Sequence, residues 1–467
     1  MIEPLAIPDA INTRHVFKQF RHDSARDRQH QHRKKYARRR LHSPHRIAPA
    51  LKHRPAEIQN HDNQPHELNQ HERQPQLFHH LDSGRNDFRD AWDRPLPVDF
   101  ALIRVHEANI LVHCEAERHL DYQPYCPTIF LMTQAELDLI RDALIQFQAE
   151  VREQIRNAHK TTGLSDVSRT SSADTIYKID TQVEEKLIHF CHELSKSVPL
   201  ILIGEGVEDE HGVEGPRTFP AGLREQDAVI RLIVDPIDGT RGIMYDKRPA
   251  WALAAVAPNL GPATRLSDCV LSVMSELPTS KMGFADVLHA QRGKGAHGFR
   301  VNLSDNSQSP LTLRPSTAVD IRHGFASVSN FFPGTKALAG ELMEHIAHAS
   351  IGPADVTKAM VFDDQYICTG GQMYELIVGH DRFNCDLRPV FYQINKQPTG
   401  LCCHPYDLAG FLIAQEAGVI LTDGLGQPLD APLDTTSGCT WAGFANASLK
   451  AAIEPMMLDF LRKHSAI

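Results

Sequence analysis

From residue 132 onward, apolar positions along the chain follow either a helical or a strand-like spacing. The first run has the helical period, with apolar residues at Leu137, Ile140, Leu144, Ile145 and Phe147. It comes directly after Thr133-Gln134-Ala135-Glu136, which has the pattern of a capping box. The sequence therefore predicts a capped helix over 133–158.

Later segments predict further helices and several strands. The expected helices cover 181–194, 338–348 and 411–417, and the last of them should end at a C-cap formed by Gly418. The expected strands cover 174–180, 199–203, 228–234, 250–257, 266–276 and 419–421, and 290–296 should form a glycine-rich turn. Such a mixture is typical of an α/β protein with layered sheets and helices.

Residues 1–131 have a different composition from the rest of the chain. They are rich in His, Arg and Gln, with a basic run at 28–35, and they lack sustained apolar periodicity. We expect either a disordered extension or a start site assigned too early, because the methionine that follows Met1 is Met132. A basic arm that binds nucleic acid is the less favoured alternative. The folded domain is then expected to span 132–467.

Composition narrows the protein class further. The 467 residues carry a formal net charge of −9, and no apolar run reaches the roughly 18 residues that a membrane span requires. The first residues lack the basic start and apolar core of a secretory signal. Nine scattered cysteines, without paired spacing, indicate reduced thiols instead of a disulfide framework or a structural zinc site. These features predict a cytoplasmic protein without a membrane partner.

The candidate chemistry lies in the segment 234–240, Val-Asp-Pro-Ile-Asp-Gly-Thr. The buried strand before it should stop at Asp235, because Pro236 has no N–H for a sheet ladder. Asp238 follows on a short turn, and the backbone amides of Gly239 and Thr240 come next. Two carboxylates beside a set of amide donors suit a divalent cation that in turn holds a phosphate.

Three more acidic residues lie beside apolar segments, where side chains can converge. Glu205 follows one apolar segment and Asp407 lies next to another. Asp180 should end the strand-like stretch before the second helix. Clustered carboxylates repel one another and normally require cations. Because no His or Cys has a matching placement, the oxygen-only set favours Mg²⁺ over zinc.

Several of these segments resemble the signatures of the inositol monophosphatase family, a family of magnesium-dependent, lithium-sensitive phosphatases. The matching segments occur in the family's order: Gly204-Glu205, Asp235-Pro236-Ile237-Asp238-Gly239-Thr240, and Tyr406-Asp407-Leu408-Ala409-Gly410 with Glu416-Ala417-Gly418. The segment 292–296 also resembles the family's glycine-rich turn. The resemblance covers about 134–460 and leaves the N-terminal segment out.

The resemblance implies a layered α-β-α-β-α sandwich of the sugar/inositol phosphatase type. It also implies a magnesium-dependent phosphomonoesterase that hydrolyses a small alcohol phosphate, such as inositol phosphate or a related polyol phosphate, by a water molecule that the metal activates. Two or three Mg²⁺ ions and a homodimer are expected. Fold-conserving alternatives are a 3'-phosphonucleotide or a sugar bisphosphate as substrate, or a non-catalytic regulator.

Carried over position by position, the resemblance also implies roles for individual residues. The metal ligands would be Glu205, Asp235, the carbonyl of Ile237, Asp238 and Asp407. The water would be oriented or deprotonated by Thr240 and Asp180, with Glu205 supporting a weaker third ion. Phosphate would be bound by Gly239, Thr240 and Arg169. The chain departs from the family at Gly206, Gly400 and Tyr406, where we expected Glu, Glu and Trp, and this puts inositol itself in doubt.

Overall fold

The first helix begins where the capping pattern predicts. The computed structural model describes residues 132–159, 167–170, 175–207, 215–353, 355, 357–464 and 466. Helix α2 (Gln134–Ala158) has Thr133 as its N-cap, and the Thr133 N–H donates to Glu136 Oε2 at 2.7 Å. The Glu136 N–H donates in return to Thr133 Oγ1 at 3.2 Å, so the capping box is confirmed. The expectations for 1–131 lie outside the described residues.

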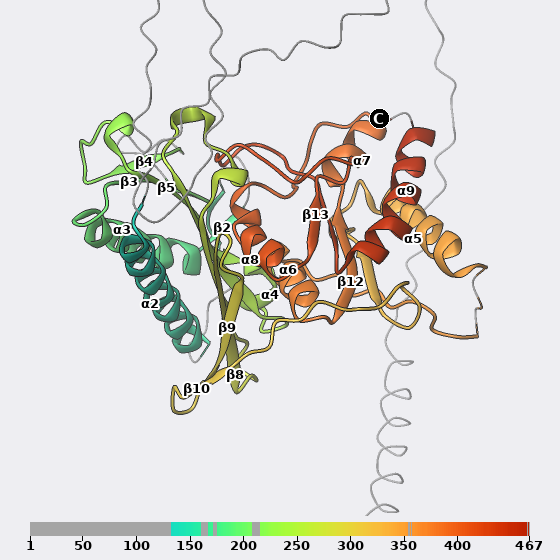
Figure 1. Ribbon diagram of the computed structural model, residues 1–467, viewed down its shortest axis with the longest axis horizontal. Helices are drawn as coiled ribbons and strands as arrows, with labels where there is room; N and C mark the ends of the chain where they lie inside the picture. Colours follow the sequence, from blue (N-terminus) through green and yellow to red (C-terminus); the bar gives the residue numbers. More distant parts are fainter. Residues whose placement is uncertain are drawn as a thin grey trace, which may run out of the picture. The chain divides into compact units, whose positions relative to one another are not determined.

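The described helices and strands form two main sheets with helices between and around them (Figure 1). The larger sheet has the order β10-β9-β8-β7-β6-β5-β3-β4, with β3 (Leu200–Gly204), β4 (Arg217–Phe219), β5 (Ile230–Asp238), β6 (Ala250–Pro258), β7 (Leu271–Leu277), β8 (Phe284–Gln291), β9 (Ala296–Asn302) and β10 (Gln308–Pro310). The smaller sheet has the order β11-β12-β14-β13, with β11 (Phe325–Val328), β12 (Asp381–Asp386), β13 (Ile420–Thr422) and β14 (Trp441–Phe444). A separate pair joins β1 (Val167–Thr170) to β2 (Thr175–Tyr177).

The helices lie in three layers around these sheets. Besides α2 they are α3 (Lys178–Ser195), α4 (Thr240–Met244), α5 (Lys336–Ile351), α6 (Thr369–Ile377), α7 (Arg388–Ile394), α8 (Phe411–Glu416) and α9 (Ala447–Lys463), with short 3-10 turns η1 (Glu225–Asp227), η2 (Gly261–Ala263), η3 (Leu266–Asp268) and η4 (Tyr406–Leu408). In Figure 1, α2 and α3 flank the large sheet, α6 and α8 lie between the sheets, and α5 and α9 cover the small sheet. This arrangement confirms the expected α-β-α-β-α sandwich. Among the described residues, no helix combines the length and apolar character that crossing a bilayer requires.

Successive side chains along the strands of the large sheet point to opposite faces, and each face packs into its own apolar core. On β6, Ala252, Ala254 and Val256 face the core shared with α2 and α3, whereas Trp251 and Leu253 face the core shared with α6 and α8. Because both faces are covered by helices, the strands read as nearly continuous apolar runs. The same two-sided burial anchors β5, whose last residues carry the candidate metal ligands.

The end of β5 differs from the prediction. The strand does not stop at Asp235 but continues to Asp238. Asp235 pairs with Leu253 and Asp238 with Trp251, so three steps along β5 oppose two steps along β6. This is a β-bulge, a position where an unpaired residue is tolerated, and Pro236 occupies it without breaking the sheet. The bulge therefore brings both aspartates into the strand end.

Two other boundaries were also predicted incorrectly. Helix α3 begins at Lys178 instead of Thr181, so Asp180 lies in the first turn of a helix. Residues 266–268 form the turn η3, and strand β7 begins only at Leu271. The helices at 338–348 and 411–417 are confirmed within one to three residues as α5 and α8, and Gly418 adopts φ 97° after α8.

Two family-like segments that are distant in sequence meet in space. The carboxylate of Glu416, at the end of α8, accepts hydrogen bonds from the Gly293 N–H at 2.7 Å and the Gly295 N–H at 2.8 Å. Both glycines have positive φ, at 72° and 78°, in the turn between β8 and β9. Glu416 thus fixes the glycine-rich turn to α8.

Candidate metal centre

Three buried or half-buried aspartates converge at the end of β5. Asp235 and Asp238 come from the bulge, and Asp407 comes from η4, which packs against β5. One carboxylate oxygen from each lies within 4.8 Å of the others. Among the described residues, these three form the group of acidic, His or Cys side chains whose ligand atoms are close enough together to bind one ion.

Backbone amides fix the direction of each carboxylate. Asp235 Oδ1 accepts from the Ile237 N–H at 3.0 Å, across the bulge itself. Asp238 Oδ2 accepts from the Gly370 N–H at 2.5 Å, at the start of α6. Asp407 Oδ2 accepts from the His404 N–H at 2.7 Å. The three side chains are therefore held in place by the fold before any ligand binds.

Burial raises the pKa of all three carboxyl groups, and neighbouring negative charges raise it further for Asp235 and Asp407. Burial and the neighbouring charges of Glu205 and Asp238 raise the pKa of Asp235 well above its usual value. Burial, followed by the charge of Asp238, raises the pKa of Asp407 to about 8. Burial raises the pKa of Asp238 to about 6, against the opposing effect of the Gly370 N–H. Without a bound cation, ionisation of all three carboxyl groups at neutral pH is therefore energetically unfavourable.

The donor set fits a hard divalent cation. It consists of carboxylate oxygens, and the thiol of Cys368, which also lines the cavity, instead donates to the Asp238 backbone carbonyl at 3.1 Å. The imidazole Nδ1 of His404 lies 3.9 Å from Asp407 Oδ2 and 3.1 Å from the Tyr406 hydroxyl. Oxygen ligands without sulfur or nitrogen favour Mg²⁺ or a similar ion over zinc.

The remaining expected residues whose side chains are described line the same cavity. Glu205, Ile237, Gly239 and Thr240 surround it together with the aspartates. The Thr240 hydroxyl donates to the Ile237 carbonyl at 2.8 Å, and that carbonyl has a second lone pair available for an ion. Gly239 has φ 96°, and an added Cβ would lie 3.0 Å from Cys368 Cβ, so only glycine fits there.

Solved structures share this architecture, although no protein-family model and no curated protein matches the sequence. The holo form of fructose-1,6-bisphosphatase from Leishmania major aligns with 71% of this chain and 96% of its own, at 13% identity and a TM-score of 0.52. The T-state of that enzyme aligns with 73% of this chain and 96% of its own, at 12% identity and a TM-score of 0.50. The chain has the fold of fructose-1,6-bisphosphatase.

Other solved structures are similar to a lesser degree. The IMPase of Thermotoga maritima aligns with 71% of this chain and its whole own length, at 15% identity and a TM-score of 0.46. The fructose-1,6-bisphosphatase fold is the one that the resemblance to the inositol monophosphatase family predicted. At the level of the fold, that resemblance is therefore confirmed.

Two expected site residues are described by their backbone alone. Asp180 lies in the first turn of α3, and Arg169 lies on β1, which pairs with β2. Neither side chain belongs to the described part of the chain. Their roles at the water and at the phosphate stay predictions.

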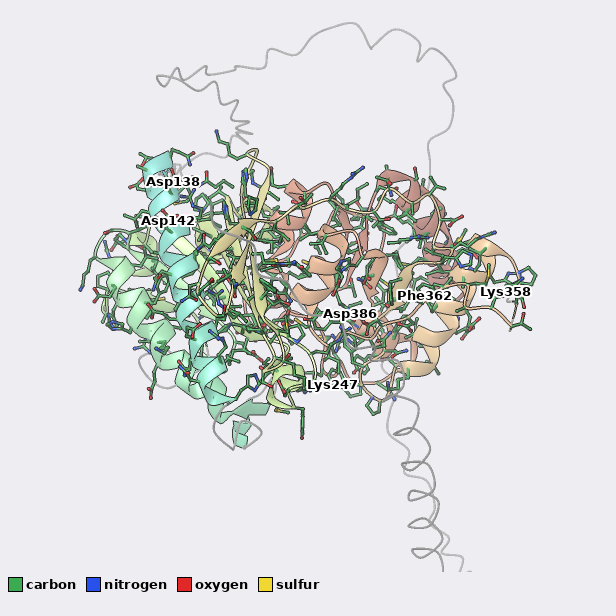
Figure 2. The ribbon with its side chains drawn as sticks, turned by 90° about the horizontal axis from the view of Figure 1, so that it is seen from below. Asp138, Asp142, Lys247, Lys358, Phe362 and Asp386 are labelled. Carbon is green, nitrogen blue, oxygen red and sulfur yellow. The ribbon has the colours of Figure 1, made fainter. Side chains whose placement is uncertain are left out.

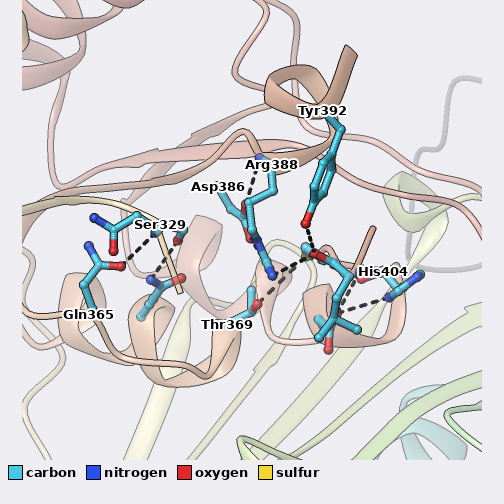
Figure 3. A network of polar contacts seen from close by, with 12 residues as sticks. Ser329, Gln365, Thr369, Asp386, Arg388, Tyr392 and His404 are labelled. Carbon is cyan, nitrogen blue, oxygen red and sulfur yellow. Dashed lines mark hydrogen bonds and ion pairs between the residues drawn. The ribbon is translucent and has the colours of Figure 1, made fainter. Parts of the chain in front are cut away.

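Several residues of the cavity were missed at the level of sequence. Phe331 and Phe332 line it, as do Cys368 on the approach to α6 and the buried Arg388. Arg388 forms a double contact with Asp386, with Nε 2.9 Å from each carboxylate oxygen (Figure 3). In the sequence, the segment Asp386-Leu387-Arg388-Pro389 is more charged than the resemblance leads us to expect, which is consistent either with contact to the alcohol part of the substrate or with a structural salt bridge. The structure contains the salt bridge between Arg388 and Asp386. No sequence signal distinguished the two phenylalanines from core residues.

Proposed function

We propose that this protein is a magnesium-dependent phosphomonoesterase that hydrolyses a small phosphate ester of an alcohol. The observation that carries the proposal is the convergence of Asp235, Asp238 and Asp407 within 4.8 Å at the end of β5. The fructose-1,6-bisphosphatase fold supports it, and so does the cavity that continues from these acids past Gly239 and Thr240.

The proposal assigns the metal to Asp235, Asp238 and Asp407, with Glu205 and the carbonyl of Ile237 completing the set. When bound there, divalent cations would neutralise the carboxylates, lower the pKa of water and stabilise phosphoryl oxygens. The backbone N–H groups of Gly239 and Thr240 would bind phosphate oxygens. The Thr240 hydroxyl, oriented by its hydrogen bond to Ile237, would align the attacking water for in-line displacement.

Arg388 and Cys368, which line the same cavity, keep this arrangement in place. Arg388 is buried and its charge lowers the pKa of Asp238 and Asp407, which partly offsets the repulsion among the acids. Cys368 caps α6, accepting from the Gly371 N–H at 3.2 Å, while its thiol contacts the Asp238 carbonyl. Helix α6 is thereby fastened to the strand end that carries two of the ligands.

The test is phosphate release by the full chain, with and without Mg²⁺, across polyol, sugar and nucleoside phosphates. We expect Mg²⁺-dependent turnover that Asp235→Asn reduces by more than roughly 100-fold, since even outer-shell partners of metal ligands are typically worth 10- to 100-fold. Asp142→Asn is the matched control, because that carboxylate is 68% exposed on α2. Turnover that persists in EDTA, or that Asp235→Asn leaves unchanged, would contradict the proposal.

A further inference from the structure

A groove lies between helices α2 and α3, which flank the large sheet (Figure 1). Its described lining residues do not overlap with those of the cavity that contains the aspartates. Its volume of about 1330 Å³ exceeds the range of about 300–1,000 Å³ that is typical of small-molecule sites. The α2 side runs from Leu139 to Ala158, which is about 28 Å at 1.5 Å per residue. The groove is therefore large enough for a segment of another polypeptide.

The floor of the groove is apolar. The rings of Phe147 on α2 and Phe190 on α3 stack there, with their centroids 4.8 Å apart. Leu139 and Leu194 extend this apolar strip. Leu139 is 45% exposed, although large apolar side chains are mostly covered elsewhere in the described part of the chain. An exposed apolar strip between polar rims is typical of a surface that binds another protein.

The rims of the groove are acidic. Four glutamates line them, two from each helix: Glu150, Glu153, Glu185 and Glu193. Lys186 is the one lysine or arginine among the described lining residues, so the groove carries a net negative charge. Glu150 accepts a hydrogen bond from the neutral amide of Gln146 at 3.1 Å, and Glu185 is exposed. A cationic ligand would therefore meet one carboxylate on each rim.

The other two glutamates are already paired. Glu153 lies 2.7 Å from Arg156, and Glu193 lies 2.6 Å from Lys196, in each case three residues further along the chain. Exposed pairs of this kind contribute little to stability, but they satisfy the two carboxylates. The negative charge that a ligand would meet is therefore concentrated at Glu150 and Glu185.

A basic amphipathic helix matches the floor and the rims together. Its apolar stripe would pack between α2 and α3, as the side chains of one helix pack into the groove that its neighbours form. Its lysines and arginines would face the glutamates, while their methylene stems would cover part of the apolar floor. A second copy of this chain fits less well, because a symmetric interface at this groove would place the same glutamates opposite one another.

We propose that the groove between α2 and α3 binds a basic amphipathic helix of a partner protein. This binding does not require the proposed function, because the groove lies apart from the metal centre. The ion pairs would form at exposed rims, where salt screens them, whereas the apolar contacts would persist. Affinity should therefore fall as the ionic strength rises, without being lost.

The experiment measures the fluorescence anisotropy of labelled peptides as the full chain is added, at about 0.15 M salt. The probe is a peptide of about 18 residues, with leucines at helical spacing and lysines between them. Two control peptides have the same length. One keeps the composition without the helical spacing, and the other has glutamate in place of lysine. The probe should bind at least about 10-fold more tightly than either control.

Variants of the full chain locate the binding. Glu150→Lys combined with Glu185→Lys should weaken probe binding by about 10-fold or more, since two attractions become repulsions. Leu139→Ser should weaken it by about 3- to 10-fold, the value of the leucine surface that the helix would cover. Asp142→Lys is the matched control and should leave the affinity unchanged, because Asp142 is 68% exposed on the same helix but does not line the groove (Figure 2). All four side chains are exposed, so the variants should fold.

The outcomes decide between the occupants of the groove. Binding of the probe that the groove variants weaken, and that Asp142→Lys does not, supports the inference. No binding of the probe, equal binding of the peptide without helical spacing, or an equal loss with Asp142→Lys overturns it.

Two further results would assign the groove to this chain itself. A peptide with the sequence of residues 28–40, the basic run, is tested in parallel. If it binds more tightly than the probe and the groove variants weaken it, the occupant is the chain's own basic segment. If sedimentation shows a smaller oligomer for the double glutamate variant than for the parent, the occupant is a second copy. Either result overturns the assignment to a partner protein.

Discussion

Glu276 is a carboxyl group outside the metal centre whose ionisation opposes folding. It lies on β7, is 8% exposed, and accepts a hydrogen bond from the Asp286 N–H at 3.1 Å. Burial, and then the charge of Asp286, raises the pKa of Glu276 from 4.5 to about 8. The folded protein therefore keeps this group protonated at pH values where the unfolded chain has already lost the proton.

This difference predicts a specific pH dependence of stability. The contribution of Glu276 to stability is complete below pH 4.5 and is lost as the pH rises toward about 8. Glu276→Gln keeps an acceptor for Asp286 but cannot ionise, so its Tm relative to the parent should increase steadily from pH 5 to pH 8.5. Thermal unfolding followed by circular dichroism measures this.

A surface carboxylate provides the control for that series. Glu341→Gln changes a side chain that is 61% exposed, and its Tm should follow the parent at every pH. Parallel curves for Glu276→Gln and the parent would contradict the raised pKa of Glu276.

The sequence allowed some residues to be assigned to the candidate site and not others. The positions of Asp235, Asp238 and Asp407 were recognisable because strand ends and short motifs bring acids together locally. Phe332 was not, because it reaches the cavity through contacts between segments that are distant in sequence. A half-buried phenylalanine has the same sequence signature whether it lines a cavity or a core.

At the scale of elements, a glycine in α6 is closely surrounded by other atoms, whereas a glycine in α5 is not. Gly370 lies in the first turn of α6 and donates its N–H to Asp238, and an added Cβ would lie 2.6 Å from Leu253 Cδ2 and 3.2 Å from Asp238 Oδ2. Leu253 is fully buried, and side chains in a close-packed core have little room to move. Gly340 lies within α5 and has no atom within 4 Å of an added Cβ.

The same substitution should therefore have opposite effects in the two helices. Gly370→Ala should lower the free energy of unfolding by about 1–3 kcal/mol through overpacking, and should also weaken Mg²⁺ binding by displacing Asp238. Gly340→Ala should raise the free energy of unfolding by about 0.5–1 kcal/mol, because alanine loses less backbone entropy than glycine when it joins a helix. Urea unfolding of both variants measures the difference, and a stable Gly370→Ala protein would show that α6 can shift away from β5.

Elements with strong local signals were the ones that the sequence predicted well. Helix α2 was predicted almost to the residue, because its cap and its apolar period agree. The end of β5 was not, because the rule against proline in a strand applies to regular pairing and not to a bulge. Helix α6 was missed because its glycines and buried polar residues give no apolar period; its place is set by packing between the two sheets.

At the scale of the whole molecule, the proposed metal centre joins distant parts of the fold. Asp235 and Asp238 belong to the large sheet, and Asp407 belongs to η4, which contacts β5, β6 and α6. An ion bound to all three would connect these parts in the folded state alone. Binding would then stabilise the protein according to the ratio of ion concentration to Kd.

Mg²⁺ should therefore raise the Tm of the full chain, and the free energy of unfolding should increase by about 2.7 kcal/mol when Mg²⁺ is at 100 times its Kd. Because the pKa of Asp238 is raised to about 6 and that of Asp407 to about 8, and Mg²⁺ binds the ionised forms, the shift should grow between pH 6 and pH 8. Asp407→Asn should lose most of the shift and be no less stable than the parent in EDTA, since one repelling charge is gone. Differential scanning calorimetry measures both quantities, and an equal Mg²⁺ shift in Asp407→Asn would contradict the assignment of Asp407.

The bulge at Pro236 shows a conflict between the regular pairing of the sheet and the placement of the site's carboxylates. A chain one residue shorter at this point could pair β5 with β6 without interruption and would make a more regular sheet. In a regular strand that kept every residue, Asp235 and Asp238 are three positions apart and would point to opposite faces. The bulge instead places them opposite Leu253 and Trp251, which share one face of β6. Sheet regularity is therefore lost where two carboxylates are brought to the same face, and selection for stability alone would be expected to remove the bulge.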